Sequence, residues 1–279
     1  MKRPFFSEPS ALPCLVVLAT LATLAATCAT AIADSSLATR AKQHGSLTVG
    51  VDFPSAPYIA GTKFRTPEGI DQELALDLAR RLQVPLTTRR ATPAQRGALL
   101  GSGAVDVLLV ALPDNDPLYR SAMVVPTGYA AGPMAIMRTD TTIKSWSQLK
   151  GRVVCVSEGS LHAGTAATEY GAIEQRYRAP ADALLAMRIG ECDAAVHDSR
   201  MLEELIKLPE WKKFSARLPT GRRQSLALVA PRGDLQTARF LKQVIEEWRS
   251  GKYFSQIQAK SVRNIAFEVY LDQNVPDCH

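Results

Sequence analysis

The stretch "GECDAAVHDSRML", residues 190–202, decides the fold of this chain. A small apolar run within it ends abruptly at His197 and Asp198, and an apolar-periodic segment follows. This pattern predicts a short buried β-strand whose tip faces a polar group. A similar pattern, Gly-x-x-Asp followed by an apolar run, occurs earlier as "GAVDVLLV", residues 103–110. We therefore expect two similar α/β halves; the alternative is a coincidental match within a single α/β domain.

The rest of the chain alternates between strand and helix patterns. Short apolar runs at 46–51, 104–112 and 149–156 predict buried strands, and leucines at helical spacing predict a helix over 69–84. A further helical stretch is expected around 179–188. Helices separated by short strands are typical of α/β layers with a mostly parallel sheet.

Two apolar segments of similar length look like crossings between the halves. "GPMAIMRTD" (132–140) would leave the first lobe, and "RQSLALVAPRGD" (223–234) would return to it. An amphipathic helix is expected after the return, within 235–257, ending at Gly251. Paired crossings of this kind form a hinge between two lobes that close around a ligand. The expected division is lobe 1 over 34–135 and 229–279, and lobe 2 over 136–228.

The N-terminal segment is typical of an export signal. Lys2 and Arg3 precede a stretch without charge from residue 11 to 33, which ends in Ala-Ile-Ala before Asp34. We interpret residues 1–33 as a cleaved signal peptide and expect a periplasmic protein. The alternatives are a membrane anchor, because the apolar span is long enough to cross a bilayer, and a lipoprotein attached through Cys28.

Composition excludes several kinds of site. The net charge of +6 is spread over scattered Lys and Arg, without the basic stripe that nucleic-acid binding needs, so we expect no nucleic-acid partner. No cysteine and histidine cluster has zinc spacing, so we expect no metal site. Cys155, Cys192 and Cys278 allow one disulfide in an oxidising compartment, but their spacing does not fix the pairing.

The ordered set "SLTVGVDFPSAPY", "GIDQELALDLARRL", "GAVDVLLV", "YRSAMVVPTGY", "SWSQLKGRVVCVSEGS", "CDAAVHDS" and "ALVAPRGDLQTARFLKQVIEEWRSGKYFSQI" resembles the family 3 periplasmic solute-binding proteins of ABC importers for amino acids. "DAAVHD" is most similar to the glutamine-binding members. The resemblance implies a two-lobed, type II clamshell. It also implies delivery of a ligand to a membrane permease, without a cofactor; we expect a monomer that is not an enzyme.

The resemblance also implies which residues bind the charged ends of a zwitterion. Arg120 corresponds to the arginine that clamps the α-carboxylate with two parallel hydrogen bonds, and its alternative is an ordinary surface arginine. Asp198 stands where the family places the carboxylate that receives the α-ammonium. Its alternative is a helix N-cap, a task that Ser199 can also perform.

Further ligand contacts are expected at the other strand tips. Ser160 and His162 lie in a loop leading into a helix, where free backbone N–H groups favour a carboxylate. His197 either hydrogen-bonds the ligand or packs under its strand. Asp52 and Tyr58 lie in the first loop, with Tyr58 as an apolar wall.

The stretch "VALPDND" (110–116), which includes Ala111, departs from the family pattern. Relatives carry hydroxyls and amides here, whereas this chain has apolar residues and the acidic pair Asp114 and Asp116. This difference favours a cationic ligand, such as a basic amino acid or a polyamine. We expect a solute-binding protein for a small polar or zwitterionic solute. The alternatives are an enzyme on the same fold, similar to cyclohexadienyl dehydratase, and a sensor without transport.

Overall fold

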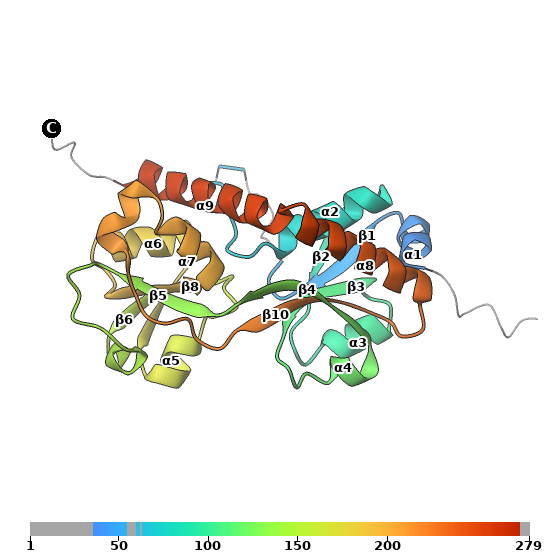
Figure 1. Cartoon of the computed structure of the whole chain (residues 1–279), viewed down its shortest axis with the longest axis horizontal. Coiled ribbons are helices and arrows are strands. Elements are labelled where there is room, and N and C mark those ends of the chain that lie inside the picture. The colour runs from blue at the N-terminus through green and yellow to red at the C-terminus, as the bar shows by residue number, and fades with distance from the viewer. Residues whose placement is uncertain (1–35, 55–59, 62, 274–279) are drawn as a thin grey trace, which may run out of the picture. The chain divides into compact units, whose positions relative to one another are not determined.

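The computed structural model describes residues 36–54, 60–61 and 63–273 (Figure 1). It contains two five-stranded sheets flanked by helices, so the predicted two-lobed α/β fold is confirmed. The signal-peptide prediction, Tyr58 and Cys278 lie outside the described residues. Within those residues no helix is both long enough and apolar enough to cross a membrane.

The first sheet has the strand order β2-β1-β3-β10-β4. Four of its strands run in one direction and β10 runs against them. Its strands are β1 (Leu47–Val51), β2 (Leu86–Arg90), β3 (Val107–Leu112), β4 (Met123–Ala131) and β10 (Gln224–Ala230). The associated helices are α1 (Leu37–His44), α2 (Asp71–Leu82), α3 (Arg96–Gly101), α4 (Leu118–Ser121) and α8 (Leu235–Ser250).

The second sheet repeats this plan with the order β7-β6-β8-β5-β9, in which β5 is the reversed strand. Its strands are β5 (Pro133–Met137), β6 (Val153–Ser157), β7 (Ile173–Tyr177), β8 (Ala194–Asp198) and β9 (Ala216–Arg217). The associated helices are α5 (Thr165–Tyr170), α6 (Pro180–Arg188), α7 (Ser199–Leu205) and α9 (Tyr253–Asp272), with the 3₁₀ turns η1 (Trp146–Leu149) and η2 (Pro209–Phe214).

The central strands of each sheet are buried on both faces, as their nearly continuous apolar sequences require, whereas the edge strands β2 and β7 are polar and partly exposed. Along β3, Val107 and Leu109 join the core under α1, α2 and α8, whereas Leu108 and Val110 join the core under α3 and α4. The second sheet has one core with α6, α7 and α9 and another with α5 and η1.

The Gly-x-x-Asp pattern performs the same task in both lobes. Gly103 (φ 70°) and Gly190 (φ 88°) adopt the left-handed backbone that favours glycine and turn the chain into the strand. The following aspartate carboxylates then accept a backbone N–H at the start of the neighbouring parallel strand: Asp106 from Thr48 (2.8 Å), and Asp193 from Val153 (3.1 Å). The internal similarity is therefore structural and not coincidental.

The predicted crossing segments connect the two sheets. Segment 132–140 contains β5 of the second sheet and 223–234 contains β10 of the first. Near the crossings, the N–H of Gly221 donates to the carbonyl of Pro133 (2.8 Å). Helix α9 differs from expectation, since we assigned all of 229–279 to lobe 1. It packs on α6 and α7, because Val262, Ile265 and Val269 complete the core of the second lobe.

Cys155 and Cys192 form a disulfide bond, which ties β6 to the turn before β8. This settles a pairing that the sequence left open. The described part of the first lobe has no cysteine, so the second lobe alone carries a cross-link within the described chain.

Candidate functional site

Polar groups at the ends of β6 and β8 converge on the carboxylate of Glu68. One of its oxygens accepts hydrogen bonds from the backbone N–H of Asp198 (2.7 Å) and the hydroxyl of Ser160 (2.9 Å). The other accepts from the hydroxyl of Ser157 (2.5 Å) and lies 2.8 Å from Nδ1 of His197. Glu68 is 5% exposed. The polar group that faces the tip of β8 is therefore a carboxylate of the chain itself.

The charge on Glu68 is stabilised by these contacts. Burial by itself raises the pKa of the Glu68 carboxyl, but the His197 ring and the Ser157 hydroxyl outweigh burial and lower the pKa to about 2. The group is consequently an anion over the physiological pH range, held by four donors from the second lobe.

Glu68 ends a segment, residues 63–68, that precedes α2 in the sequence but contacts the second lobe. Thr66 donates from its N–H (3.0 Å) and its hydroxyl (2.6 Å) to Glu268 of α9. Arg65 donates from Nε to Asp182 of α6 (2.9 Å) and also pairs with Asp272 of α9. The 63–68 segment is thus a further connection between the lobes, beside the two crossings.

Asp198 acts as the N-cap of α7, the alternative that the sequence left open. Its Oδ1 accepts from the N–H groups of Arg200 (2.7 Å) and Met201 (3.3 Å), and from the hydroxyl of Tyr129 (3.3 Å). Its Oδ2 accepts no hydrogen bond from the described residues. Burial and the nearby carboxylate of Glu68 raise the pKa of Asp198 to about 6, although the capping bonds oppose this shift.

The strand ends of the first lobe hold a different cluster, centred on the buried guanidinium of Arg96. Its Nη2 pairs with Asp52, its Nη1 lies 3.5 Å from Asp116, and its Nε donates to the carbonyl of Ala91 (3.3 Å). The backbone N–H of Ala111 donates to Asp52 (3.0 Å). Burial raises the pKa of Asp52, and Arg96 only partly offsets that effect.

Asp71, the first residue of α2, adds another acid beside this cluster. Burial and the carboxylate of Asp52 raise the pKa of Asp71 to about 7. Asp71 lies three positions after Glu68, so α2 begins between the two clusters. Three carboxyl groups, those of Asp52, Asp71 and Asp116, therefore lie near one another, and Arg96 pairs with two of them.

Two buried ring nitrogens at the second-lobe cluster have no hydrogen-bond partner among the described residues: Nε2 of His162 and Nε2 of His197. Both residues are almost fully buried, with 4% and 0% of their surface exposed. Burial lowers the pKa of His162, and Glu68 only partly offsets this effect. A buried nitrogen without a hydrogen bond lowers the stability of the folded protein, so these two atoms are available to a polar ligand.

The predicted site residues fall into three groups in the structure. Asp52 and Ala111 meet in the first-lobe cluster, and Ser160, His162, His197 and Asp198 meet in the second-lobe cluster. Arg120 instead lies exposed on the short helix α4, and no described side chain pairs with it. Its role as a carboxylate clamp stays a prediction. Tyr58 lies outside the described residues.

Sequence analysis missed Glu68, Arg96 and Asp71. Glu68 precedes the helix pattern as part of an unremarkable "TPEG", and Arg96 opens a short helix with no charge pattern. One signal for Arg96 was present in the sequence. The loops of the first lobe carry several aspartates, and a buried carboxylate needs a cation to pair with.

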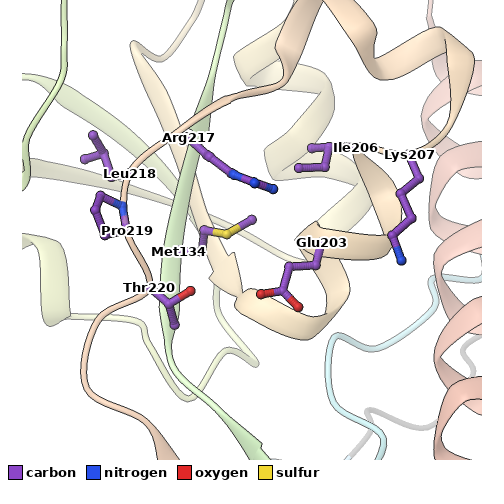
Figure 2. Close-up of a pocket in the computed structure, with 8 residues that line it drawn as sticks. All are labelled: Met134, Glu203, Ile206, Lys207, Arg217, Leu218, Pro219 and Thr220. Atoms are coloured by element: carbon purple, nitrogen blue, oxygen red, sulfur yellow. The ribbon is translucent and has the colours of Figure 1, made fainter.

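A pocket of about 560 Å³ lies elsewhere, beside β5, β9 and α7 (Figure 2). Its lining includes Met134, Glu203, Lys207 and Arg217, and none of the predicted site residues contributes to it. This pocket therefore carries no argument about the ligand expected at the strand ends.

Neither a known family model nor a curated protein matches the chain. Solved structures do match. The fold is that of amino-acid-binding proteins. A variant of ArgBP from T. maritima has 21% identity and a TM-score of 0.55, over 81% of this chain and 99% of that one. An amino acid ABC transporter substrate-binding protein from Streptococcus pneumoniae, solved with L-arginine, has 18% identity and a TM-score of 0.54, over 81% and 98%.

An ancestral cationic amino acid solute-binding protein is also similar, with 19% identity and a TM-score of 0.58 over 81% of this chain and all of that one. Another structure of this ancestor is described as a precursor of cyclohexadienyl dehydratase. At these identities the likeness establishes the two-lobed fold, and the ligand has to be argued from the residues of this chain.

Proposed function

We propose that the chain is an exported solute-binding protein that captures a small cationic solute, an amino acid or a related compound, and presents it to the membrane permease of an ABC importer. Residues 1–33 direct the export, and the mature chain works in the periplasm. The similar structures support this proposal, since their descriptions name arginine and cationic amino acids as ligands.

The observation that carries the proposal is the excess of acids at the strand ends. Asp52 and Asp116 share one buried guanidinium, that of Arg96, and the carboxyl of Asp71 lies close enough to Asp52 for their charges to repel. Asp198 stands in the second-lobe cluster, beside the carboxylate of Glu68. Burial is the main cause of the raised pKa values of Asp71 and Asp198, and in each case a neighbouring carboxylate adds to the shift. A cationic ligand would offset the negative charge of these carboxylates, whereas an anionic ligand would be repelled by them.

A thermal-shift screen of residues 34–279 tests the ligand class. The panel contains arginine, lysine, ornithine, agmatine, cadaverine, putrescine, glutamine and glutamate. A cation at 100-fold its dissociation constant is expected to add about 2.7 kcal/mol to the free energy of unfolding. Stabilisation by glutamate or glutamine alone would contradict a cationic ligand.

The substitution Asp198→Asn tests the site. Asparagine also caps helices well, so α7 is retained while the charge is removed. We expect the variant to lose most of the stabilisation by the cation. The exposed Glu246→Gln on α8 changes the net charge equally and should respond as the wild type does. Equal responses of all three proteins would show that the ligand binds elsewhere.

A second candidate is an enzyme on the same fold, favoured by the described precursor of cyclohexadienyl dehydratase and by the raised pKa of Asp198. A carboxyl that is protonated near pH 6 can act as a proton donor. Glu158, by contrast, is an exposed loop residue. Incubation with prephenate or arogenate and detection of the aromatic product tests this candidate. A cation recovered unchanged from the protein favours the binding function.

A further inference from the structure

Glu68 is held as a bound ligand carboxylate would be held. Each of its two oxygens accepts from two donors, and all four donors come from the strand ends of the second lobe. The donors are two hydroxyls, one backbone N–H and one imidazole, which is a complete set for an ionised carboxylate. Glu68 itself lies outside the second lobe in the sequence, three residues before the start of α2 at Asp71.

We propose that Glu68 is a specificity-determining residue that takes the place of a ligand carboxylate, so that the protein selects amines lacking a carboxylate over the corresponding amino acids. This inference rests on the proposed function and narrows its substrate class. The preferred ligands are the decarboxylated compounds: agmatine over arginine, cadaverine over lysine, and putrescine over ornithine.

The guanidinium of the first-lobe cluster is not free to receive a ligand carboxylate. Arg96 is already engaged by Asp52, Asp116 and the carbonyl of Ala91. Arg120 is exposed on α4. An amino-acid carboxylate entering this cluster would therefore face Asp52 and Asp116 while their guanidinium partner is already engaged, and desolvating a carboxylate unpaired is costly.

The second lobe can only receive a ligand carboxylate if Glu68 leaves. That movement would leave four hydrogen-bond donors without their acceptor. It would also pull Glu68 away from the second lobe, although Arg65 and Thr66 of the same segment are anchored to α6 and α9. A ligand without a carboxylate does not require this exchange. The anchored segment thus disfavours the binding of amino acids but not that of the corresponding decarboxylated amines.

The remaining unpaired atoms suit an amine. Nδ1 of His197 lies 2.8 Å from the Glu68 carboxylate, so Nδ1 is the nitrogen that carries the proton in this contact. In the tautomer with its single proton on Nδ1, Nε2 is an acceptor. That Nε2 is buried and has no partner among the described residues. The hydrogen bonds that the described residues donate to Asp198 all go to its Oδ1. Acceptors of this type bind the N–H groups of an ammonium or a guanidinium.

The test is isothermal titration of the mature protein with the three matched pairs, in which each amine differs from its amino acid only by the carboxylate. For the wild type we expect the favoured amine to bind at least about 10-fold more tightly than its amino acid, which equals about 1.4 kcal/mol. The near-isosteric Glu68→Gln removes the anion and should reduce or reverse that ratio. Glu68→Ala serves as a second variant, with Glu246→Gln as the charge control and the melting curve of each free protein as the check on folding.

The outcomes separate the inference from the proposed function. A preference for amines in the wild type and in Glu246→Gln, reduced in either folded Glu68 variant, supports the inference. A preference for amino acids in the wild type overturns it but leaves a cationic solute as the ligand. A preference for amines that neither Glu68 variant changes also overturns the role of Glu68. If no member of the three pairs binds, the proposed function fails, and the inference fails with it.

Discussion

At the strand ends of both lobes, buried polar groups are paired with a charged side chain of the chain itself, which comes from a different place in each lobe. In the first lobe the acids Asp52 and Asp116 are paired with Arg96, which belongs to the same lobe. In the second lobe the donors at β6 and β8 are satisfied by Glu68, which lies before α2 of the first lobe. One cluster is therefore part of a lobe, and the other joins two lobes.

This difference separates stability from recognition. A buried ion pair within a lobe is formed when that lobe folds, and removing one partner leaves an uncompensated charge in the core. A contact between lobes can break while both lobes stay folded, so it is available to a ligand that competes for the same donors. We expect substitutions in the first cluster to act mainly on folding and those in the second mainly on binding.

The largest effect is expected for Arg96→Ala, which breaks the first-lobe cluster. Asp52 and Asp116 would be left buried without their cation, and such a loss costs about 3–5 kcal/mol in the free energy of unfolding. Urea denaturation measures it, with the exposed Arg239→Ala on α8 as the matched control, expected within about 0.5 kcal/mol of wild type. A loss below about 1 kcal/mol in Arg96→Ala would remove the distinction between the two clusters.

The next effect concerns the cross-link that the second lobe alone possesses within the described chain. The double variant Cys155→Ser and Cys192→Ser releases a loop with a sequence separation of 37 residues. We expect a loss of about 2–4 kcal/mol, because the unfolded chain regains freedom. Measured beside the wild type with and without reductant, the variant should show no response to the reductant. A variant as stable as the oxidised wild type would contradict this account.

A smaller, pH-dependent effect is expected for Asp198→Asn in the free protein. The folded pKa of about 6 lies above the ordinary value of 3.8, so the native state keeps a proton that the unfolded state has lost. The stability of the wild type should therefore fall as the pH rises from about 4 to about 6. Asparagine does not titrate, so the variant should gain on the wild type over this window, by on the order of 1–3 kcal/mol at pH 8. Parallel stability profiles from pH 4 to 8 would show that this carboxyl is not perturbed.

The smallest effect is expected for Arg120→Ala, since Arg120 is exposed and lies outside both clusters. Stability should change by less than about 0.5 kcal/mol, and agmatine affinity by less than about 2-fold. Isothermal titration of the variant and of the wild type with agmatine measures this difference in affinity. A loss of binding of about 10-fold or more would restore Arg120 to the role that the family resemblance suggests.

The two-lobed plan was predictable because it depends on local patterns. The strand tips at His197 and Asp198 and the two Gly-x-x-Asp turns follow from apolar runs and from glycine, which are visible over a few residues. The site was predictable only in part. Ser160, His162, His197 and Asp198 do gather at one edge of the second sheet, as strand order requires. Glu68 and α9 reach that lobe through contacts between residues far apart in the sequence, which no local pattern reveals.

The central claim is that Glu68 is bound as an ionised carboxylate by the donors of the second lobe, and its pKa tests this most directly. Proteins labelled with ¹³C at the glutamate carboxyls, with Glu68→Gln to assign the signal, allow the titration to be followed by NMR. The account predicts that the Glu68 carboxyl stays ionised down to acidic pH, with a pKa of about 2. A titration at the ordinary value of 4.5 would show a solvated side chain and would contradict the claim.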